Sequence, residues 1–585
     1  MPEQPPAAKR RRTAFAPRRC AVRLAATLLL APLATSSAQQ HDAVDEYVER
    51  AMAQQHIPGL SLAVIRNGRV IKAKGYGLAN VEHRVAATPS TVYELASTTK
   101  PFMATAILLL AQDGKLRLDD DITRWIDSVP ATWRGVTIRH LLTHTSGIKD
   151  YLADLRHDFP HDAPPGAIAR VVLDAPPNFA PGAKWSYSNS GYVLLGLVVR
   201  KASGEPWDAF LRRRVLGPLA MTETRRDTPD GVVPARAAGY LWYGAGGLHN
   251  GDFLKYMMTN HGDRGLLSTA LDLAKYDIAL ADDRLLTAAS REAMWRPVTL
   301  TDGSTFGYGL GWFVETTRGH RHVFHPGGAP GTAAFLSRYP DDGLAIVMLS
   351  NGGAAYPQAL DLGIAQRYIP ALAPGPVVTL PPARLDEYAG FYNAFGSQLL
   401  TIRREGDALT LDDGGRLANR FVALSDSTFA AEDADRGVTV RRSPSGAVVG
   451  LTLRLAADTM SVQCIAPLPA GNAPATDPDP ALTRRVEAVL RAFEQGGAAV
   501  EQVPHLAPQA RRDSARWPAP EFSGIRGITF ISAHDLRGRG ISRHGAEVAR
   551  VLVYGLRLES GSRTVLVYLT SDGQVTDQDV VVDRY

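Results

Sequence analysis

Apolar residues change their spacing twice within the first two thirds of the chain. After a helical period over residues 44–55, the stretch GLSLAVIRNGRVIKAKGYG alternates apolar and polar residues on both sides of Asn67-Gly68. An Asn-Gly pair between two alternating runs is the strongest short signal for a β-hairpin. We therefore predict here the first strands of an antiparallel sheet.

A helical period dominates residues 97–260, and a strand pattern returns between residues 301 and 351. The predicted helices cover residues 105–112, 137–143, 190–201 and 206–216, and the strand stretches are FGYGLGWFVE, RHVFHPGG, TAAFLSRYP and LAIVMLSN. Strands on both sides of a helical region predict one discontinuous α/β domain, an antiparallel sheet flanked by helices with an inserted all-α lobe. A ligand site is expected in the cleft between sheet and lobe.

Two proline-rich stretches divide the rest of the chain and are predicted to be linkers. Alternating runs between them predict a small all-β domain, and a helical segment followed by strands predicts an α+β domain at the end. The predicted organisation is a signal peptide at 1–38, the α/β domain at 39–370, a linker at 371–384, the all-β domain at 385–467, a linker at 468–481 and the α+β domain at 482–585.

The N-terminal segment has the order of a secretory signal. Basic residues come first, an apolar run over residues 24–34 follows, and Ser36-Ser37-Ala38 resembles a cleavage site. The alternative is an uncleaved anchor, but the run is about half of the ~20 residues that a membrane span needs, and no later segment reaches that length. We expect a periplasmic or extracellular protein without a transmembrane segment after signal removal. Arg18-Arg19 leaves twin-arginine and general export both open.

Charge and cysteine content exclude several classes of protein. The chain carries a net charge of +5, but its first 38 residues hold seven basic side chains against one acidic one, so the remainder carries −1. The basic balance is therefore no sign of a nucleic-acid partner, and none is expected. Cys464 is the single thiol after the signal, which rules out an internal disulfide and a cysteine-based zinc site.

Ser-x-x-Lys occurs twice, at Ser97/Lys100 and at Ser146/Lys149. A lysine one helical turn from a serine can lie beside its hydroxyl, and desolvation would lower the lysine pKa so that it can take the serine proton. The alternative for Ser97 is an ordinary helix N-cap. The second pair is set aside because Gly147 and the lack of a following apolar helix indicate a helix end.

Two further motifs follow Ser97 along the chain. Tyr187-Ser-Asn189 stands before a predicted helix, where the tyrosine could act as a phenolate-type base and later as an acid, and Asn189 could orient the lysine and the substrate. His325-Pro-Gly327-Gly328 ends a strand, and a backbone N–H there could form an oxyanion hole together with that of Ser97. The alternatives are a buried aromatic residue beside an Asn N-cap, and a simple glycine turn.

The three motifs in this order resemble the serine β-lactamase and penicillin-binding-protein superfamily, in particular the branch related to class C β-lactamases that includes D-aminopeptidases, esterases and D-Ala-D-Ala carboxypeptidases. The stretches TIRHLLTHTSGI, PNFAPGAKWSYSNSGY, RGLLSTALDLAKY and FGYGLGW are also similar to that branch. The resemblance implies that Ser97 is the acyl-forming nucleophile and that Lys100 and Tyr187 handle its proton. It also implies that Asn189 lines the pocket and that the Ser97 and Gly328 amides hold the oxyanion. Residues 385–455 are similar to the small β-barrel-like domain often appended to these hydrolases.

One departure from the family affects the expected substrate. In β-lactamases of this branch the third motif usually opens with a lysine that helps to bind the substrate carboxylate, whereas this chain has His325. Since neutral imidazole is not a fixed cation at pH 7, the resemblance implies an ester, amide or D-amino-acid peptide substrate rather than a β-lactam. The alternatives are a β-lactamase, or a penicillin-binding sensor protein with little turnover.

No metal or organic cofactor is expected. His320 and His322 share one face of a predicted strand and His325 follows, but no acidic residue accompanies them in RGHRHVFHPGG, which argues against zinc.

Overall fold

The computed structural model describes residues 42–581, except for 128, 154–175, 229–230, 243–246, 252–261, 354, 395–397, 413–418, 456–457, 469–474, 509, 512–521, 523 and 560. The predicted signal peptide lies outside the described residues. Among the helices that are described, none is long and apolar enough to cross a membrane.

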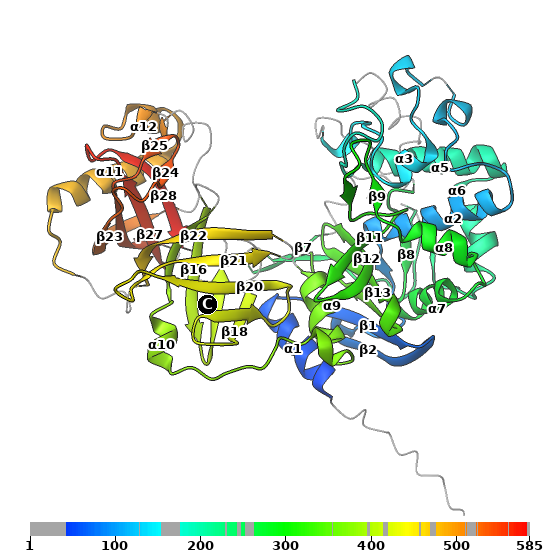
Figure 1. Cartoon of the computed structure of the whole chain (residues 1–585), viewed down its shortest axis with the longest axis horizontal. Coiled ribbons are helices and arrows are strands. Elements are labelled where there is room, and N and C mark those ends of the chain that lie inside the picture. Colours follow the sequence, from blue (N-terminus) through cyan, green and yellow to red (C-terminus); the bar gives the residue numbers. More distant parts are fainter. Residues whose placement is uncertain are drawn as a thin grey trace, which may run out of the picture. The chain divides into compact units, whose positions relative to one another are not determined.

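A seven-stranded antiparallel sheet joins the two ends of the predicted α/β domain (Figure 1). Its order is β11 (Phe313–Thr317), β12 (His320–Ala329), β13 (Thr332–Tyr339), β14 (Leu344–Ser350), β1 (Gly59–Arg66), β2 (Arg69–Asn80) and β3 (Val85–Ala86). Leu62 of β1 pairs with Met348 of β14, so strands from opposite ends of the domain are neighbours. The predicted discontinuous domain is confirmed.

The hairpin at Asn67-Gly68 is also confirmed. Asn67 has a φ of 49° and Gly68 a φ of 73°, and Arg66 pairs with Arg69 across the turn. Two consecutive positive φ angles are the requirement of the type I′ turn that matches the twist of a two-residue hairpin.

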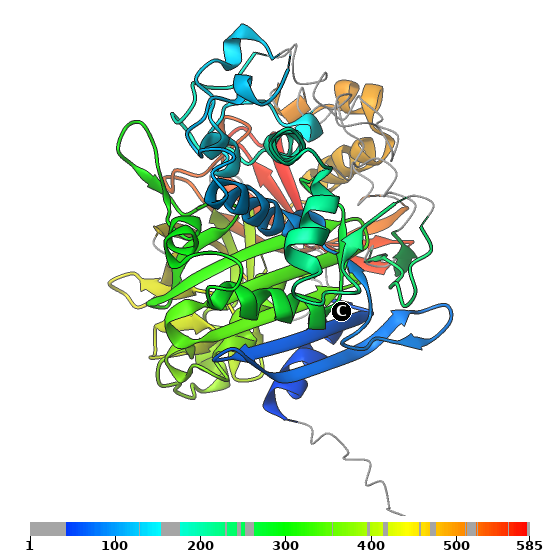
Figure 2. The same ribbon diagram turned by 90° about the vertical axis from the view of Figure 1, so that its right-hand side faces the viewer.

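Helices cover both faces of the sheet (Figure 2). On one face, α1 (Ala43–Gln54) and α9 (Pro357–Ala365) bury their apolar residues against the strands. On the other face lie α7 (Ala270–Ala281) and the helical lobe, with α2 (Lys100–Gln112) buried along almost its entire length. Because both faces are covered, β1 and β14 are apolar and buried along both of their sides rather than on alternate residues.

The lobe matches the predicted helices with shifted ends. The predicted helix 190–201 is α5 (Asn189–Ser203), and the helix predicted at 105–112 begins earlier, at Lys100, with Pro101 in its first turn, where a missing N–H costs nothing. The helix predicted over 206–216 is present, but its second half is π-helical instead of α-helical. It consists of α6 (Trp207–Leu211) and a π-helical turn, η5 (Arg212–Leu216), in which the Gly217 N–H donates to the carbonyl of Arg212, five residues back.

Short elements complete this part of the chain. The helices are α3 (Ile138–Leu142), α8 (Ala288–Met294) and the 3-10 turns η1 (Ala96–Thr99), η2 (Ile122–Arg124), η3 (Ala131–Trp133), η4 (Tyr151–Ala153), η8 (Pro340–Asp342) and η9 (Pro370–Leu372). The strands are β4 (Tyr93–Glu94), β5 (Arg225–Arg226), β6 (Tyr240–Trp242), β7 (Leu248–Asn250), β8 (Leu266–Ser268), β9 (Val298–Thr299) and β10 (Thr305–Phe306).

The predicted all-β segment is a closed eight-stranded barrel with its own apolar core, preceded by α10 (Pro382–Asp386). Each strand pairs with the next along the chain, and the last strand pairs with the first. The strands are β15 (Gly390–Ala394), β16 (Gln398–Glu405), β17 (Ala408–Asp412), β18 (Asn419–Ala423), β19 (Thr428–Ala431), β20 (Arg436–Arg442), β21 (Val448–Leu455) and β22 (Asp458–Pro467).

The last segment is α+β, as predicted. The helices α11 (Pro480–Gln495) and α12 (Gly497–Gln502) pack on an antiparallel sheet of order β23-β26-β27-β28. Its strands, with the small pair β24-β25, are β23 (Ile525–Asp535), β24 (Ser542–Arg543), β25 (Ala546–Glu547), β26 (Arg550–Leu558), β27 (Gly561–Leu569) and β28 (Val575–Val581). The boundaries of the six predicted segments stay predictions.

Candidate active site

Ser97 lies in the turn η1, between strand β4 and helix α2. The preceding residue, Ala96, has a φ of 45°, a left-handed conformation that is uncommon for a residue with a Cβ and that clusters at functional sites. A backbone hydrogen bond anchors the residue before this turn to β8, because the Leu95 N–H donates to the carbonyl of Leu266 at 2.9 Å. Ser97 is half-buried, so its hydroxyl remains accessible.

The N-cap interpretation of Ser97 is wrong. The N-cap of α2 is Thr99, and no side chain caps the helix there. Ser97 stands one 3-10 turn before the helix, and its hydroxyl accepts a hydrogen bond from the Lys100 Nζ at 3.0 Å instead.

Lys100 is fully buried, and its ammonium group has three hydrogen-bond acceptors. These are Ser97 Oγ at 3.0 Å, Asn189 Oδ1 at 2.9 Å and the backbone carbonyl of Asp263 at 2.8 Å. Burial lowers the pKa of Lys100 to about 8, while the carboxylates of Asp263 and Asp150 act in the opposite direction. Lys100 therefore loses its proton more easily than an exposed lysine does, as the sequence predicts.

Asn189 is oriented by a carboxylate. Its Nδ2 donates to Asp150 Oδ2 at 2.9 Å, which turns its Oδ1 toward Lys100. The N-cap of α5 is Ser188, whose hydroxyl accepts from the Gly191 N–H, so the alternative of Asn189 as a mere cap is wrong.

Tyr187 lies over the site with its ring 4.8 Å from the Lys100 ammonium and 4.3 Å from the ring of His144. Burial raises the pKa of Tyr187 well above its usual value, although a hydrogen bond with Ser97 opposes this shift. The phenolate form is thereby disfavoured. The prediction of a phenolate-type base is not supported, and Tyr187 is suited instead to donate a proton.

His325 is completely buried on β12. Its Nδ1 donates to the carbonyl of Pro326 at 2.7 Å, and its Nε2 lies 3.1 Å from the Tyr308 hydroxyl. Burial and the nearby charge of Lys100 lower the pKa of His325 to about 3. The imidazole is therefore neutral at physiological pH, as the sequence analysis assumed.

The glycines after His325 bring β12 close to the turn of Ser97. A Cβ on Gly327 would lie 2.0 Å from the carbonyl oxygen of Leu95, whereas Gly328 is exposed and has open space at that position. The pairing of β12 with β11 extends only to Phe324, so beyond it one edge of β12 faces η1 while the other edge stays paired with β13. The arrangement is suited to the predicted oxyanion hole, which stays a prediction.

Sequence reasoning missed a series of hydrogen bonds that connects the motifs through two further residues, His144 and Tyr308. The Ser188 N–H donates to His144 Nδ1 at 3.1 Å, His144 Nε2 lies 3.2 Å from the Tyr308 hydroxyl, and that hydroxyl continues to His325. Because His144 Nδ1 and His325 Nε2 both accept, His144 donates to Tyr308 and Tyr308 donates to His325. These hydrogen bonds join the second motif to the third. His144 lies in the stretch LLTHTSG and Tyr308 in FGYGLGW, and the similarity of both stretches to the family could have indicated the two residues.

A second group of residues missed by sequence reasoning lies close to Lys100. Asp263 is 1% exposed, and its Oδ2 accepts from the hydroxyl of Tyr151 at 2.7 Å. Burial raises the pKa of Asp263 to about 6, with the charge of Lys100 acting against the shift. No sequence signal distinguished Asp150, Tyr151 or Asp263 from ordinary loop residues.

The second Ser-x-x-Lys does not form a site. Ser146 is buried and its hydroxyl accepts from the Ile148 N–H, whereas Lys149 is exposed.

The histidines of β12 do have acidic partners, contrary to the sequence argument. Asp342 lies 2.9 Å from His320, and Asp361 lies 3.2 Å from His322. They come from other elements, which is why the local sequence did not show them. Each histidine meets a separate carboxylate, and the described residues contain no group of three ligands that could hold a metal ion.

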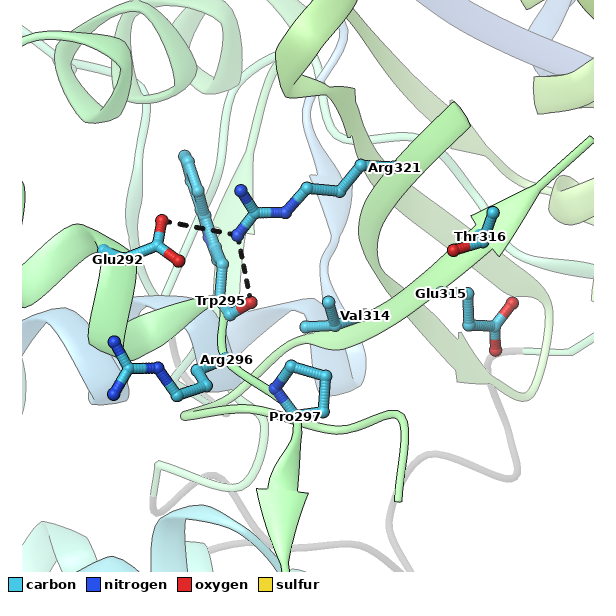
Figure 3. A pocket seen from close by; sticks show the side chains of 8 residues that line it. All are labelled: Glu292, Trp295, Arg296, Pro297, Val314, Glu315, Thr316 and Arg321. Atoms are coloured by element: carbon cyan, nitrogen blue, oxygen red, sulfur yellow. Dashed lines mark hydrogen bonds and ion pairs between the residues drawn. The ribbon is translucent and has the colours of Figure 1, made fainter. Parts of the chain in front are cut away.

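A pocket of about 350 Å³ lies elsewhere, between α8 and the strands β11 and β12 (Figure 3). Its Arg321 reaches toward Glu292 and the carbonyl of Trp295, as Figure 3 shows. None of the seven predicted site residues lines this pocket. It is therefore not the candidate active site.

A buried lysine beside an accessible serine, within this fold, defines the class of serine hydrolases that work through an acyl-enzyme. The chain belongs to the family described as Beta-lactamase, whose model matches residues 44–368. It is 30% identical over 398 residues to Penicillin-binding protein 4* of Bacillus subtilis (strain 168), which covers 62% of this chain and 87% of that protein.

The chain is similar to two other proteins. Protein flp of Staphylococcus aureus (strain N315) is 28% identical over 330 residues, or 55% of this chain and 65% of that protein. The structure of the octameric penicillin-binding protein homologue from Pyrococcus abyssi superimposes with a TM-score of 0.53 at 24% identity, over 72% of this chain and 99% of that one. That likeness supports the fold.

Proposed function

We propose that the protein is an exported serine hydrolase in which Ser97 forms an acyl-enzyme with an ester, an amide or a D-amino-acid peptide. The observation that carries this proposal is the hydrogen bond of 3.0 Å between Lys100 Nζ and Ser97 Oγ, made by a buried lysine that has lost part of its affinity for the proton. The basic, apolar and small-residue order of residues 1–38 supports export.

Lys100 is the base of the acylation step. As an ammonium group it donates to all three of its acceptors, whereas the neutral amine keeps two donors for Asn189 and Asp263 and turns its lone pair to Ser97. With a pKa of about 8, roughly a tenth of the lysine is neutral at pH 7. Ser97 then attacks the carbonyl carbon while its proton passes to Lys100.

Tyr187 completes the proton transfer. Its hydroxyl keeps its proton because of burial and is hydrogen-bonded to Ser97. It can therefore give a proton to the leaving group as the tetrahedral intermediate collapses, and recover one from Lys100. Water then attacks the acyl-enzyme. The amides of Ser97 and Gly328 are proposed to hold the oxyanion in both steps.

The charges around the site favour substrates without an obligatory carboxylate. The third motif supplies a neutral imidazole, because His325 is buried and its pKa is about 3. Asp150, which is half-buried, and Asp263 both place negative charge near Lys100. A substrate carboxylate would be repelled by these groups, which supports the preference for esters, amides and D-amino-acid peptides that have no carboxylate beside the scissile bond over β-lactams.

The second candidate is a β-lactamase or a penicillin-binding sensor protein with little turnover. The similarity to penicillin-binding protein relatives favours it. In this case a penicillin would acylate Ser97 and the ester would persist, because the site would lack an efficient route for the deacylating water.

A substrate panel tests both candidates. The full chain is incubated with a chromogenic ester, a D-alanyl peptide, a D-amino-acid amide, a cephalosporin and a penicillin, and intact-mass spectrometry follows acylation. Ser97→Ala is the test variant and Ser146→Ala the matched control from the second Ser-x-x-Lys. We expect turnover of an ester or amide that is lost in Ser97→Ala and kept in Ser146→Ala. Equal activity of wild type and Ser97→Ala would overturn the proposal, and a persistent penicilloyl adduct on Ser97 without turnover of any compound would favour the sensor.

A further inference from the structure

A buried carboxylate lies beside Lys100 and forms no ion pair with an arginine or lysine among the described residues. Asp263 is 1% exposed, its Oδ2 accepts from Tyr151, and its Oδ1 has no hydrogen-bond partner among the described residues. The adjacent Arg264 forms a buried ion pair with Glu94 instead. A buried carboxylate that is not directly paired is costly for the fold, so its presence at this position calls for a role.

Lys100 is the cation that acts on this carboxylate. Its Nζ donates to the backbone carbonyl of Asp263 at 2.8 Å, which keeps the ammonium and the side chain of the same residue close together. The charge of Lys100 lowers the pKa of Asp263, and the charge of Asp263 raises that of Lys100. The two groups therefore titrate as a coupled pair.

The other groups that face Lys100 come from several elements. Asp150, beyond α3, adds a second negative charge that favours the ammonium form. Uncharged partners are the hydroxyl of Ser97, the amide of Asn189 and the rings of Tyr187 and Tyr192, at 4.8 and 5.4 Å from the ammonium. His144 and His325 are kept neutral by burial and by the charge of Lys100 itself. Asp263 is the fully buried anion of this set.

We infer that Asp263 is a positioning residue that acts through Lys100: its negative charge holds Lys100 in the ammonium form and so sets the pH range in which Lys100 can take the proton of Ser97. The inference rests on the proposed function. It assigns to Asp263 a task that none of the three sequence motifs covers. Tyr151 supports this role of Asp263, because its hydroxyl donates to the carboxylate and stabilises the ionised form of Asp263.

The coupling has a consequence for the pH dependence. Between about pH 6 and pH 8, where the two groups ionise, Asp263 gains its charge as the pH rises and thereby opposes the deprotonation of Lys100. The rate of Ser97 acylation should therefore rise less steeply than tenfold per pH unit in this range. Without the carboxylate, Lys100 should deprotonate in one step with its midpoint about one pH unit lower.

The test compares wild type and Asp263→Asn across pH 5 to 9. The amide introduced by this substitution keeps an acceptor for Tyr151 but lacks the charge. A fluorophosphonate probe labels the nucleophile of the full chain, and intact-mass spectrometry gives the labelling rate without need of a known substrate. We expect Asp263→Asn to react severalfold faster than wild type near pH 7, with the two rates converging at about pH 5 and at about pH 9.

Two further variants keep the result interpretable. Tyr151→Phe removes the hydrogen bond to Asp263 without removing the carboxylate, and should also react faster near pH 6 to 7 with no change near pH 9. Asp272→Asn is the matched control, because Asp272 is 2% exposed and pairs with Lys275 rather than with Lys100. Its profile should follow that of wild type.

The outcomes separate the inference from the proposed function. If wild type is labelled at Ser97 but Asp263→Asn and Tyr151→Phe show the wild-type profile, or one that is scaled equally at every pH, the inference is wrong and the nucleophile stands. If wild type and Ser97→Ala are labelled alike, or neither is labelled, the proposed function is wrong and the inference falls with it.

Discussion

Asp150 and Asn189 form a hydrogen bond of 2.9 Å that fixes the orientation of the Asn189 amide. An amide has one accepting and one donating end, so a carboxylate on Nδ2 leaves Oδ1 for the ammonium of Lys100, 2.9 Å away. A flipped amide would place two donors against each other at Lys100. Asp150 thus controls the geometry of the lysine through one intermediate side chain.

We predict that Asp150→Leu lowers kcat/KM by about tenfold at pH 9, because the net loss of an oriented hydrogen bond near a charge costs about 1.4 kcal/mol. At this pH, above the Lys100 pKa of about 8, the lost charge of Asp150 no longer changes how much of Lys100 is the free amine. Asp150→Asn, which can still accept from Asn189, should lose less. The measurement is kcat/KM on the best compound of the substrate panel, together with the labelling rate of Ser97. Equal losses in the two variants would contradict the orienting role of Asp150.

Replacement of Lys100 by methionine tests the base. Lys100→Met keeps an unbranched side chain, shorter by one atom, but removes the proton-accepting nitrogen, and general-base catalysis contributes about 10²- to 10⁴-fold. We expect the labelling rate of Ser97 to fall by at least about 10²-fold. Lys149→Met, from the exposed lysine of the second Ser-x-x-Lys, is the matched control and should react as wild type does. A fast Lys100→Met variant would exclude Lys100 as the base.

Much of the fold could be predicted because its signals are local. The alternation of apolar and polar residues around Asn67-Gly68 predicts the hairpin. The order of predicted strands, helices and strands along the chain predicts the discontinuous sheet. The ends of the helices and their type, α or π, were harder to predict from the sequence. In residues 206–216 the apolar spacing fits both an α-helix and the π-helical turn, and the difference lies in which carbonyl accepts from Gly217.

The site could be predicted only where a motif is contiguous. Ser97 and Lys100 are three residues apart, and the pair is visible in the sequence. Asp263 meets Lys100 across 163 residues, and His144 meets Tyr308 across 164. Such contacts exist only once the sheet and the lobe have folded together. The sequence therefore indicates the residues inside its motifs, including the orienting Asn189, but not the orienting residues outside them.

The pH dependence of acylation follows from two opposite shifts. Lys100 must lose its proton to act as a base, and its pKa is about 8, so the rate should rise with pH and level off above that value. Tyr187 must keep its proton, and burial raises its pKa well above 10, so its ionisation should not reduce the rate below about pH 10. Labelling rates from pH 5 to 10, with circular dichroism at each pH to confirm folding, give the profile. A decline between pH 8 and 10 in a folded protein would contradict the protonated state of Tyr187.

Gly327 and Gly328 are neighbours in strand β12 and provide a matched pair that tests how closely this strand approaches the turn of Ser97. A Cβ on Gly327 would lie 2.0 Å from the carbonyl oxygen of Leu95, so Gly327→Ala must push the turn that carries Ser97 away from β12. A displacement of about 1 Å in a reacting group costs on the order of 10²-fold in rate. We expect such a loss in the labelling rate of Ser97.

Gly328→Ala is the comparison, because its Cβ would enter open space and its backbone N–H is retained. It should lose much less activity than Gly327→Ala and unfold near the wild-type temperature, whereas Gly327→Ala should unfold at a lower temperature because backbone atoms of Leu95 and Thr98 must shift. The measurement is the labelling rate beside a thermal melt. Equal losses in the two variants would mean that the path of the backbone past Leu95 does not decide the position of Ser97, and that side-chain bulk at the mouth of the site acts instead.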